Sequence, residues 1–309
     1  MFVERSACGV GFVADLSGKS SRNILDIGIT SAKNLVHRGA VSADGKTGDG
    51  AGVLTQIPRK LVNKELKKLG ISVDPNNVAV GVFFFNEHVK TIMEMVEDFA
   101  KKLGLTVLAW RDVPVYEQAL GDIALSSKPV IKHLYLEFPK SISIREVERK
   151  LFLIRKYSEK VANQNKTKVY IPSISTSKIV YKGLFISTQI DKFYLDLQDP
   201  DYETSFCIFH QRYSTNTHPR WDIAQPFRYI AHNGEINTLL GNIKWMEARE
   251  KAWNSSKVWS KEEIELIKPI IWSDGSDSSM LDNAVEILYL SGRDICSSMA
   301  MLIPEPYEV

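Results

Sequence analysis

A cysteine near the start of the chain has the residue type and the position for nucleophilic catalysis. Cys8 lies in the string SACGVGF, and removal of the seven residues before it would make it N-terminal. One residue would then carry a thiol and a free α-amine, whose pKa of roughly 7.7–8.0 suits a general base near neutral pH. An N-terminal amine is one of the groups that activate nucleophiles in proteins. The alternative is that Cys8 is a small buried residue of a first strand, as free cysteines commonly are.

Three further parts of the chain are too polar and too rich in glycine to be read as core. They are residues 37–52, which contain HRGA and TGDGAG, residues 210–217 (HQRYSTNT) with 232–238 (HNGEINT), and residues 275–278 (GSDS). Polar side chains held on glycine-rich loops are typical of binding and catalytic sites.

Each of these segments also has an ordinary structural explanation. The string GDG at 48–50 fits a turn and lacks the G-x-x-x-x-G-K-[ST] pattern of a phosphate loop. Asn233-Gly234 fits a hairpin turn, and Asp277 fits the N-cap of a following helix. Arg212 fits an ordinary partner for a carboxylate. Taken one at a time, the segments therefore leave both interpretations open.

Composition excludes several classes of function. The chain has 309 residues, 44% hydrophobic and 25% charged, as in ordinary globular proteins. Its net charge of +2 gives no electrostatic case for a nucleic-acid or membrane partner. No apolar run approaches the roughly 18 residues of a membrane span. The start, MFVERSA, is too short and too charged for a secretory signal.

The cysteines point to a reducing environment. Cys8, Cys207 and Cys296 are far apart in sequence and form no C-x-x-C pair. This usage argues against a disulfide framework, a structural zinc site or an iron–sulfur cluster within the chain. We therefore expect a cytoplasmic protein.

The elements that must position these segments alternate between strands and helices. Hydrophobic patterning predicts strands over 8–14, 53–57, 78–85, 105–110, 129–138, 178–190, 205–213 and 227–232, and helices over 22–36, 59–69, 87–103, 144–163, 238–253, 260–267, 278–290 and 294–302. We expect the charges of the helix over 144–163 to form a solvated face, and residues 163–175 to form a polar surface loop. The pattern, without internal repeat or clear domain boundary, suits helices layered on stacked sheets.

Taken together, the polar segments resemble one family. From Ala7 to about Pro304 the chain resembles the N-terminal glutaminase domain of glutamate synthase large subunits, which are class II glutamine amidotransferases of the N-terminal-nucleophile hydrolase superfamily. The resemblance is densest over residues 210–217 and 221–250, through AQPFRYIAHNGEINTLLGNIKWMEARE. Other class II members share the Cys-Gly and Asn-Gly elements but not the strings RYSTNT and GEINTLLGN. The resemblance implies an α+β fold, a four-layer αββα sandwich of two mostly antiparallel sheets.

The resemblance also implies how the reaction would be carried out. Cys8 matches the family's nucleophile, exposed when a propeptide of residues 1–7 is removed to leave a glutaminase domain over 8–309. Its α-amine would act as general base through a water molecule and then protonate the departing ammonia. Asn233 and Gly234 match the oxyanion hole, through the side-chain amide of one and the backbone N–H of the other.

Three residues match groups that hold L-glutamine or the nucleophile. Arg212 matches the residue that binds the α-carboxylate, and Asp277 the residue that binds the α-ammonium, so peptide-linked glutamine should be rejected. Arg38 is expected to orient Cys8. Further candidates for supporting hydrogen bonds are Asp49, Thr215 and Asn237, and we interpret as structural the three histidines His37, His210 and His232.

The resemblance finally implies a partner and a division of cofactors. Ammonia would pass to a synthase domain or subunit that aminates 2-oxoglutarate with FMN and an iron–sulfur cluster. We expect no cofactor in this chain, which would be a fragment of that enzyme or a separately encoded domain. Two alternatives stay open. The chain could deliver ammonia to another acceptor, or it could be a non-catalytic glutamine-binding module if residues 1–7 are never removed.

Overall fold

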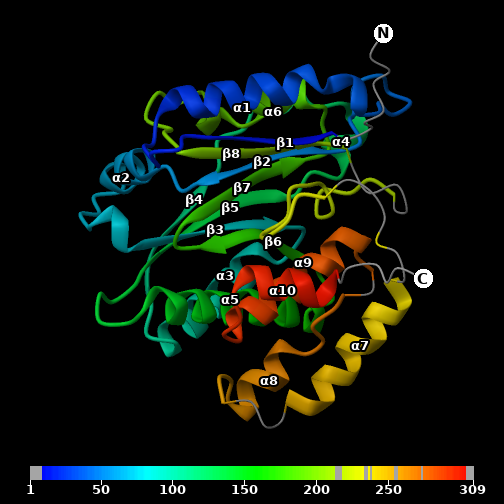
Figure 1. The fold of residues 1–309 in the computed structure, drawn as a ribbon. Helices are drawn as coiled ribbons and strands as arrows, with labels where there is room; N and C mark the ends of the chain where they lie inside the picture. The colour runs from blue at the N-terminus through cyan, green and yellow to red at the C-terminus, as the bar shows by residue number, and fades with distance from the viewer. Residues whose placement is uncertain are drawn as a thin grey trace.

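Two four-stranded antiparallel sheets lie face to face between layers of helices in the computed structural model (Figure 1). The structure describes residues 9–212, 218–232, 236, 239–253, 257–272 and 274–303. The order of layers is helix, sheet, sheet, helix (Figure 1). The expected αββα sandwich of two antiparallel sheets is thereby confirmed.

The first sheet places the start of the chain beside three later strands. Its order is β1 (Val10–Ala14), β8 (Phe206–Gln211), β2 (Ala51–Gln56), β7 (Lys178–Gly183). Helix α1 (Arg22–Asn34) covers its outer face, with α6 (Ile190–Phe193) beside it (Figure 1). Gly28 of α1 must be a glycine, because a Cβ there would lie 2.5 Å from Cys207 Sγ of β8. This close approach brings α1, and the loop that follows it, against the strands.

The second sheet supplies most of the apolar packing. Its order is β4 (Thr106–Asp112), β5 (Val130–Glu137), β3 (Val78–Phe85), β6 (Val169–Ser175). Every residue of β3, with sequence VAVGVFFF, is buried. Such a continuous apolar run is typical of a strand covered on both faces. Its outer face packs on α3 (Val89–Lys102) and α5 (Ile144–Gln164), through side chains that include Phe83, Ile92, Val96 and Leu151.

The remaining described α-helices surround these layers. They are α2 (Arg59–Lys68), α4 (Asp122–Ser126), α7 (Leu239–Ala252), α8 (Lys261–Ile267), α9 (Asp277–Leu290) and α10 (Ile295–Leu302). Helices α8 and α9 contact α5. Side chains of α5, α7, α8 and α9 form a separate apolar cluster, which ties the C-terminal helices to the second sheet. None of the described helices combines the length and the apolar character that crossing a bilayer requires.

Four local predictions from the sequence are wrong. Residues 178–190, expected as a strand pair or one long bent strand, form the strand β7 only over Lys178–Gly183 and then a 3₁₀ turn over Ser187–Gln189. Residues 169–175 form the buried strand β6 and not a surface loop, because Ser173 and Ser175 satisfy their hydroxyls by hydrogen bonds inside the fold. Residues 227–232 form an irregular segment and not a strand. The helix α5 also buries charges that we expected in solvent, since α9 packs beside it; these are Arg155, Lys156 and Glu159.

Candidate active site

The predicted site residues divide into two groups. Arg38, Arg212 and Asp277 belong to the described residues. Cys8, Asn233 and Gly234 lie outside them, as do Thr215 and Asn237. The described neighbours of the second group are nevertheless informative, because Gly9 follows Cys8 and His232 precedes Asn233 in the chain.

The residue after Cys8 lies between the loop at Arg38 and the end of β8. Gln211 donates its backbone N–H to Gly9 O at 2.6 Å. A Cβ on Gly9 would overlap Gln211 O and would lie 3.5 Å from Arg38 Cβ, so only glycine fits at position 9. Arg38 ends a short 3₁₀ turn, Val36–Arg38, directly after α1. The fold therefore brings Arg38 beside the residue that follows Cys8, although the two are far apart in sequence.

Arg212 follows β8 with an unusual backbone. Its φ of 145° is a value that favours glycine, and its N–H donates to Gly50 O at 3.0 Å. Such conformations cost about 1–3 kcal/mol and persist where the surrounding structure imposes them, often at functional sites. Gly50 itself has φ 128°. The loop over 37–52 and the end of β8 thus fix each other's backbone.

Asp49 is a buried carboxylate in the same place. Only 4% of the residue is exposed, and neither carboxylate oxygen has a hydrogen-bond partner among the described residues. A Cβ on Gly39 would overlap Gln211 Nε2 and would lie 3.2 Å from Asp49 Oδ1. Burial raises the pKa of Asp49 to about 6; the backbone of Ala40 and of Asp49 itself, which makes no hydrogen bond of regular geometry to the carboxylate, and then the positive charge of Arg212 act in the opposite direction. Asp49 is therefore an acid whose charge changes near neutral pH at the end of the first sheet.

We expect Asp49→Asn to stabilise the protein near neutral pH. The folded pKa of about 6 lies above the ordinary value of 3.8. The folded chain thus keeps a proton that the unfolded chain loses, and this contribution to stability, complete below about pH 4, is lost as the pH rises through about 6. The thermal midpoint of the variant should therefore rise relative to that of wild type between about pH 4 and about pH 6.

The control for this prediction is Asp15→Asn. Hydrogen bonds from Ser17 lower the pKa of Asp15, so the variant should lose stability relative to wild type as the pH rises. If the difference in thermal midpoint between Asp49→Asn and wild type stayed constant from acid to neutral pH, the pKa of Asp49 would not be raised in the folded protein.

Asp277 is the first residue of α9 but does not cap it. The N-cap is Ser276, whose Oγ accepts from Ser279 N at 3.3 Å. Asp277 is 7% exposed, and its Oδ2 accepts from Ile236 N at 3.2 Å. The carboxylate therefore faces the segment that begins at Asn233. It also lines a cavity of about 360 Å³ together with Met280 of the same helix and Asn242 and Arg249 of α7.

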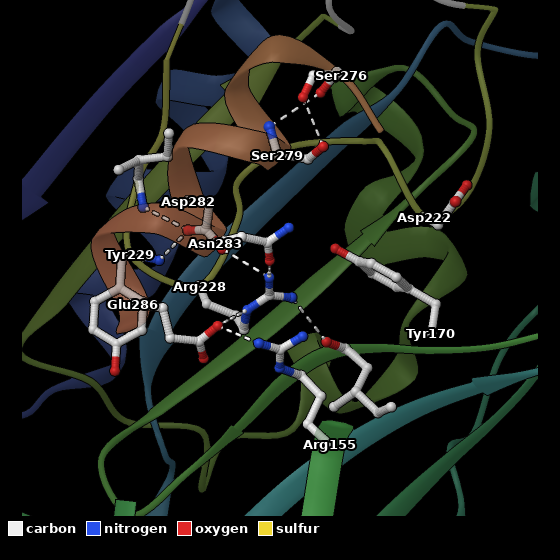
Figure 2. Close-up of polar contacts among 12 residues, drawn as sticks. Arg155, Tyr170, Asp222, Arg228, Tyr229, Ser276, Ser279, Asp282, Asn283 and Glu286 are labelled. Carbon is white, nitrogen blue, oxygen red and sulfur yellow. Dashed lines mark hydrogen bonds and ion pairs between the residues drawn. The ribbon is translucent and has the colours of Figure 1, made fainter. Parts of the chain in front are cut away.

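A cluster of buried charges holds the segment before Asn233 onto α9 (Figure 2). Arg228 contacts Asp282 at 3.0 Å and Glu286 at 3.2 Å, and Glu286 also pairs with Arg155 of α5. Asp282 Oδ1 accepts the backbone N–H groups of Tyr229 and Ile230, at 2.6 and 3.2 Å. The segment is thereby attached by its backbone as well as by a side chain.

We did not predict this cluster from the sequence. The available signal was the pair Asp282 and Glu286, four residues apart in the largely apolar helix MLDNAVEILYL. Residues at that spacing share one helix face. Their partner, Arg228, lies in the segment for which we expected a strand.

The described histidines near the site contact backbone groups. His210 Nε2 lies 3.2 Å from His232 O, and His37 Nδ1 lies 3.2 Å from Asn34 O. Burial lowers the pKa of His210 to about 4, so its ring is neutral near pH 7. These contacts agree with a structural role for both side chains.

The two described cysteines lie away from these segments. Cys207 is buried beneath α1, where burial raises the pKa of its thiol to about 12, and Cys296 is exposed on α10. A thiol with so high a pKa is not a nucleophile near neutral pH. Within the described part of the chain, no three His, Cys, Asp or Glu side chains are grouped so that they could hold a metal ion.

Comparisons with known proteins agree with the sequence resemblance. A family model for class II glutamine amidotransferases matches residues 8–309. A ferredoxin-dependent glutamate synthase of Pyropia yezoensis is 42% identical, over 99% of this chain and 20% of its own length. The large chain of glutamate synthase [NADPH] of Bacillus subtilis is 41% identical, over 98% of this chain and 20% of its own. The corresponding chain of Azospirillum brasilense is 39% identical with the same coverage. The chain thus spans about a fifth of the length of the curated relatives it matches.

Proposed function

Because the chain belongs to the class II glutamine amidotransferases, a family of enzymes, we propose that it hydrolyses L-glutamine to L-glutamate and ammonia with Cys8 as nucleophile. The observation that carries this proposal is the meeting of separate segments at one end of the first sheet. Gly9 contacts Gln211 and Arg38, Arg212 contacts Gly50, and His210 contacts the carbonyl of His232. The residues assigned to nucleophile and oxyanion hole, and Arg38 and Arg212, lie on or next to these segments in sequence, and Asp277 lies next to Ser278, which contacts His232.

The reaction begins with the N-terminal residue. The α-amine of Cys8, acting through a water molecule, takes the thiol proton as sulfur attacks the side-chain amide carbon of glutamine. The same amine then protonates the departing nitrogen, which leaves as ammonia. Water hydrolyses the resulting thioester to glutamate and restores the thiol. This chemistry requires removal of residues 1–7, and the match of the family model from residue 8 onward supports that boundary.

The remaining assigned residues stabilise the charged groups of the substrate and of the tetrahedral intermediate, or orient Cys8. Asn233 and Gly234 donate hydrogen bonds to the oxyanion of the tetrahedral intermediate, and loss of one such donor costs about 2.7–4 kcal/mol of barrier. Arg212 binds the α-carboxylate in the two-pronged manner that a guanidinium allows. Asp277 binds the α-ammonium, and Arg38 orients Cys8 from beside Gly9.

We further propose that the ammonia serves a synthase domain or subunit that converts 2-oxoglutarate to glutamate. The names of the relatives, which are glutamate synthases, support this assignment. FMN and the iron–sulfur cluster would then belong to residues outside this chain. Cysteine usage supports a reducing compartment such as the cytoplasm.

The intact mass of the protein after incubation with 6-diazo-5-oxo-norleucine, a glutamine analogue that alkylates such cysteines, tests the proposal. We expect a chain that lacks residues 1–7 and carries one adduct on Cys8. Cys296→Ser should keep the adduct, which controls for alkylation of the exposed thiol, and Cys8→Ser should lose it. A full-length mass without an adduct would contradict the proposal and favour a binding module.

A further inference from the structure

The segment that leads into the oxyanion hole is held by the side chain of one glutamine. We propose that Gln225 is a positioning residue for the oxyanion hole, because its amide fixes the backbone of His232, the residue directly before Asn233 and Gly234. This inference rests on the proposed function of Cys8 and Asn233.

Both ends of the Gln225 amide bind the same residue. Its Nε2 donates to His232 O at 2.6 Å, and its Oε1 accepts from His232 N at 2.9 Å. The side chain thus pairs with one residue as a neighbouring strand would, and only a primary amide offers a donor and an acceptor at this spacing. Gln225 is 1% exposed, so water does not compete for these bonds.

Gln225 is itself fixed on the first sheet. A Cβ on Gly52 of β2 would lie 2.5 Å from Gln225 O, and a Cβ on Gly50 would lie 3.3 Å from Ala224 Cβ. The backbone at 224–225 therefore packs directly on the strand that follows Asp49. A strand is a more rigid support for a functional group than a loop.

The contacts of His232 connect the pair to the rest of the site. Its carbonyl lies 3.2 Å from His210 Nε2 of β8, and its Nδ1 lies 3.2 Å from Ser278 Oγ, next to Asp277. Near neutral pH the low pKa of His210 leaves its ring uncharged. His232 is therefore held between β8 and the start of α9, with Gln225 supplying two of its hydrogen bonds.

The preceding residues are attached independently. Asp282 holds the N–H groups of Tyr229 and Ile230 against α9 (Figure 2). Residues 225–232 therefore form a loop secured by Asp282 in its middle and by Gln225 at its end. Removing the Gln225 bonds leaves His232, at the end that continues to Asn233, with only its contacts to His210 and Ser278, while the middle remains attached.

The rate of catalysis should depend on the position of His232, because Asn233 and Gly234 follow it directly in the chain. Oxyanion donors act only when they lie about 2.7–3.1 Å from the developing charge, and a displacement of about 1 Å can cost about 100-fold in rate. Binding of the glutamine ends by Arg212 and Asp277 does not depend on this geometry. Loss of the Gln225 amide should therefore lower kcat and leave ground-state binding nearly intact.

The test uses Gln225→Glu, which keeps the shape but places an acceptor against His232 O. We expect kcat for ammonia release to fall about 10- to 100-fold, with the inhibition constant of L-glutamate within about threefold of wild type. The matched control is Gln198→Glu, because Gln198 Nε2 also donates to a backbone carbonyl, at 2.7 Å, but on the surface. This control should leave both constants unchanged. If Gln225→Glu does not fold, Gln225→Met carries the same expectations.

A double-variant cycle separates positioning from general destabilisation. In an Asn233→Ala background, Gln225→Glu should lower kcat by a smaller factor than it does in the wild-type background, because one of the two donors that it positions is already absent. The full effect of Gln225→Glu in that background would overturn the proposal, as would an unchanged kcat in the single variant. A weakening of L-glutamate inhibition equal to the loss in kcat would also overturn it. A wild-type protein that releases no ammonia would instead contradict the proposed function itself.

Discussion

Cys8→Ala should abolish ammonia release from L-glutamine in a protein that begins at residue 8. Removal of a catalytic nucleophile lowers kcat by about 10⁶-fold in a well-studied hydrolase, and we expect a loss of that order here. Substrate binding should survive, because Arg212 and Asp277 are unchanged. Ammonia release at saturating glutamine measures the first expectation, and binding of L-glutamine by calorimetry measures the second.

The retained propeptide offers a matched comparison, because it leaves the thiol in place and removes only the base. With Ala7 joined to Cys8 the α-amine becomes an amide nitrogen, which cannot accept a proton. A positioned general base contributes about 10²- to 10⁴-fold, so the precursor should be slower than the mature protein by that factor. Equal turnover by the two forms would exclude the N-terminal amine as the base.

The sheets could be predicted largely from the sequence because their strands carry strong local patterns. The run VAVGVFFF of β3 is apolar throughout, and the structure buries every residue of it. The helices α3 and α5 follow the 3.6-residue period of a face that packs on this sheet. The layer order could not be derived in this way and came from the family resemblance.

The wrong predictions share one physical cause. Inside the fold, polar side chains form the hydrogen bonds and ion pairs that neighbouring strands or water would otherwise supply. Residues 227–232 have the composition of a strand, yet their N–H groups bind the side chains of Asp282 and Gln225. Ser173 of β6 looked solvent-exposed in sequence, but its Oγ accepts from Val180 N of β7. These hydrogen bonds depend on residues that are distant in sequence, so local periodicity cannot predict them.

The candidate site could also be predicted only in part, because many of its contacts join residues that are distant in sequence. Glycines at 9, 39 and 50 marked a place where the backbone must fold closely, and the structure explains two of them by overlap with Gln211. Sequence spacing could not place Arg38 beside Gly9 or Asp277 beside Ile236, because these contacts join segments that are far apart in sequence. Gln225 had no local signal at all, since its role follows from bonds to a residue seven positions later.

Arg212→Met should lower kcat/KM for L-glutamine by about 10²- to 10⁴-fold. Hydrogen bonds to charged groups contribute about 1.5–3 kcal/mol each, and a guanidinium makes two of them with a carboxylate. The measurement that isolates this contact compares L-glutamine with its α-amide, which has no α-carboxylate. Wild type should prefer L-glutamine by the same factor, whereas the variant should use both substrates with similar low efficiency.

Arg220→Met is the control, because Arg220 is also close in sequence but pairs with Asp222 at 2.8 Å. It should keep the wild-type preference. Asp277→Asn should in turn remove discrimination against N-acetylated glutamine, which lacks the α-ammonium, while keeping the preference over the α-amide. If Arg212→Met lowered activity on L-glutamine and on its α-amide by the same factor, Arg212 would support the fold of the site and not the α-carboxylate. The two blocked substrates therefore assign each charged end of glutamine to one side chain.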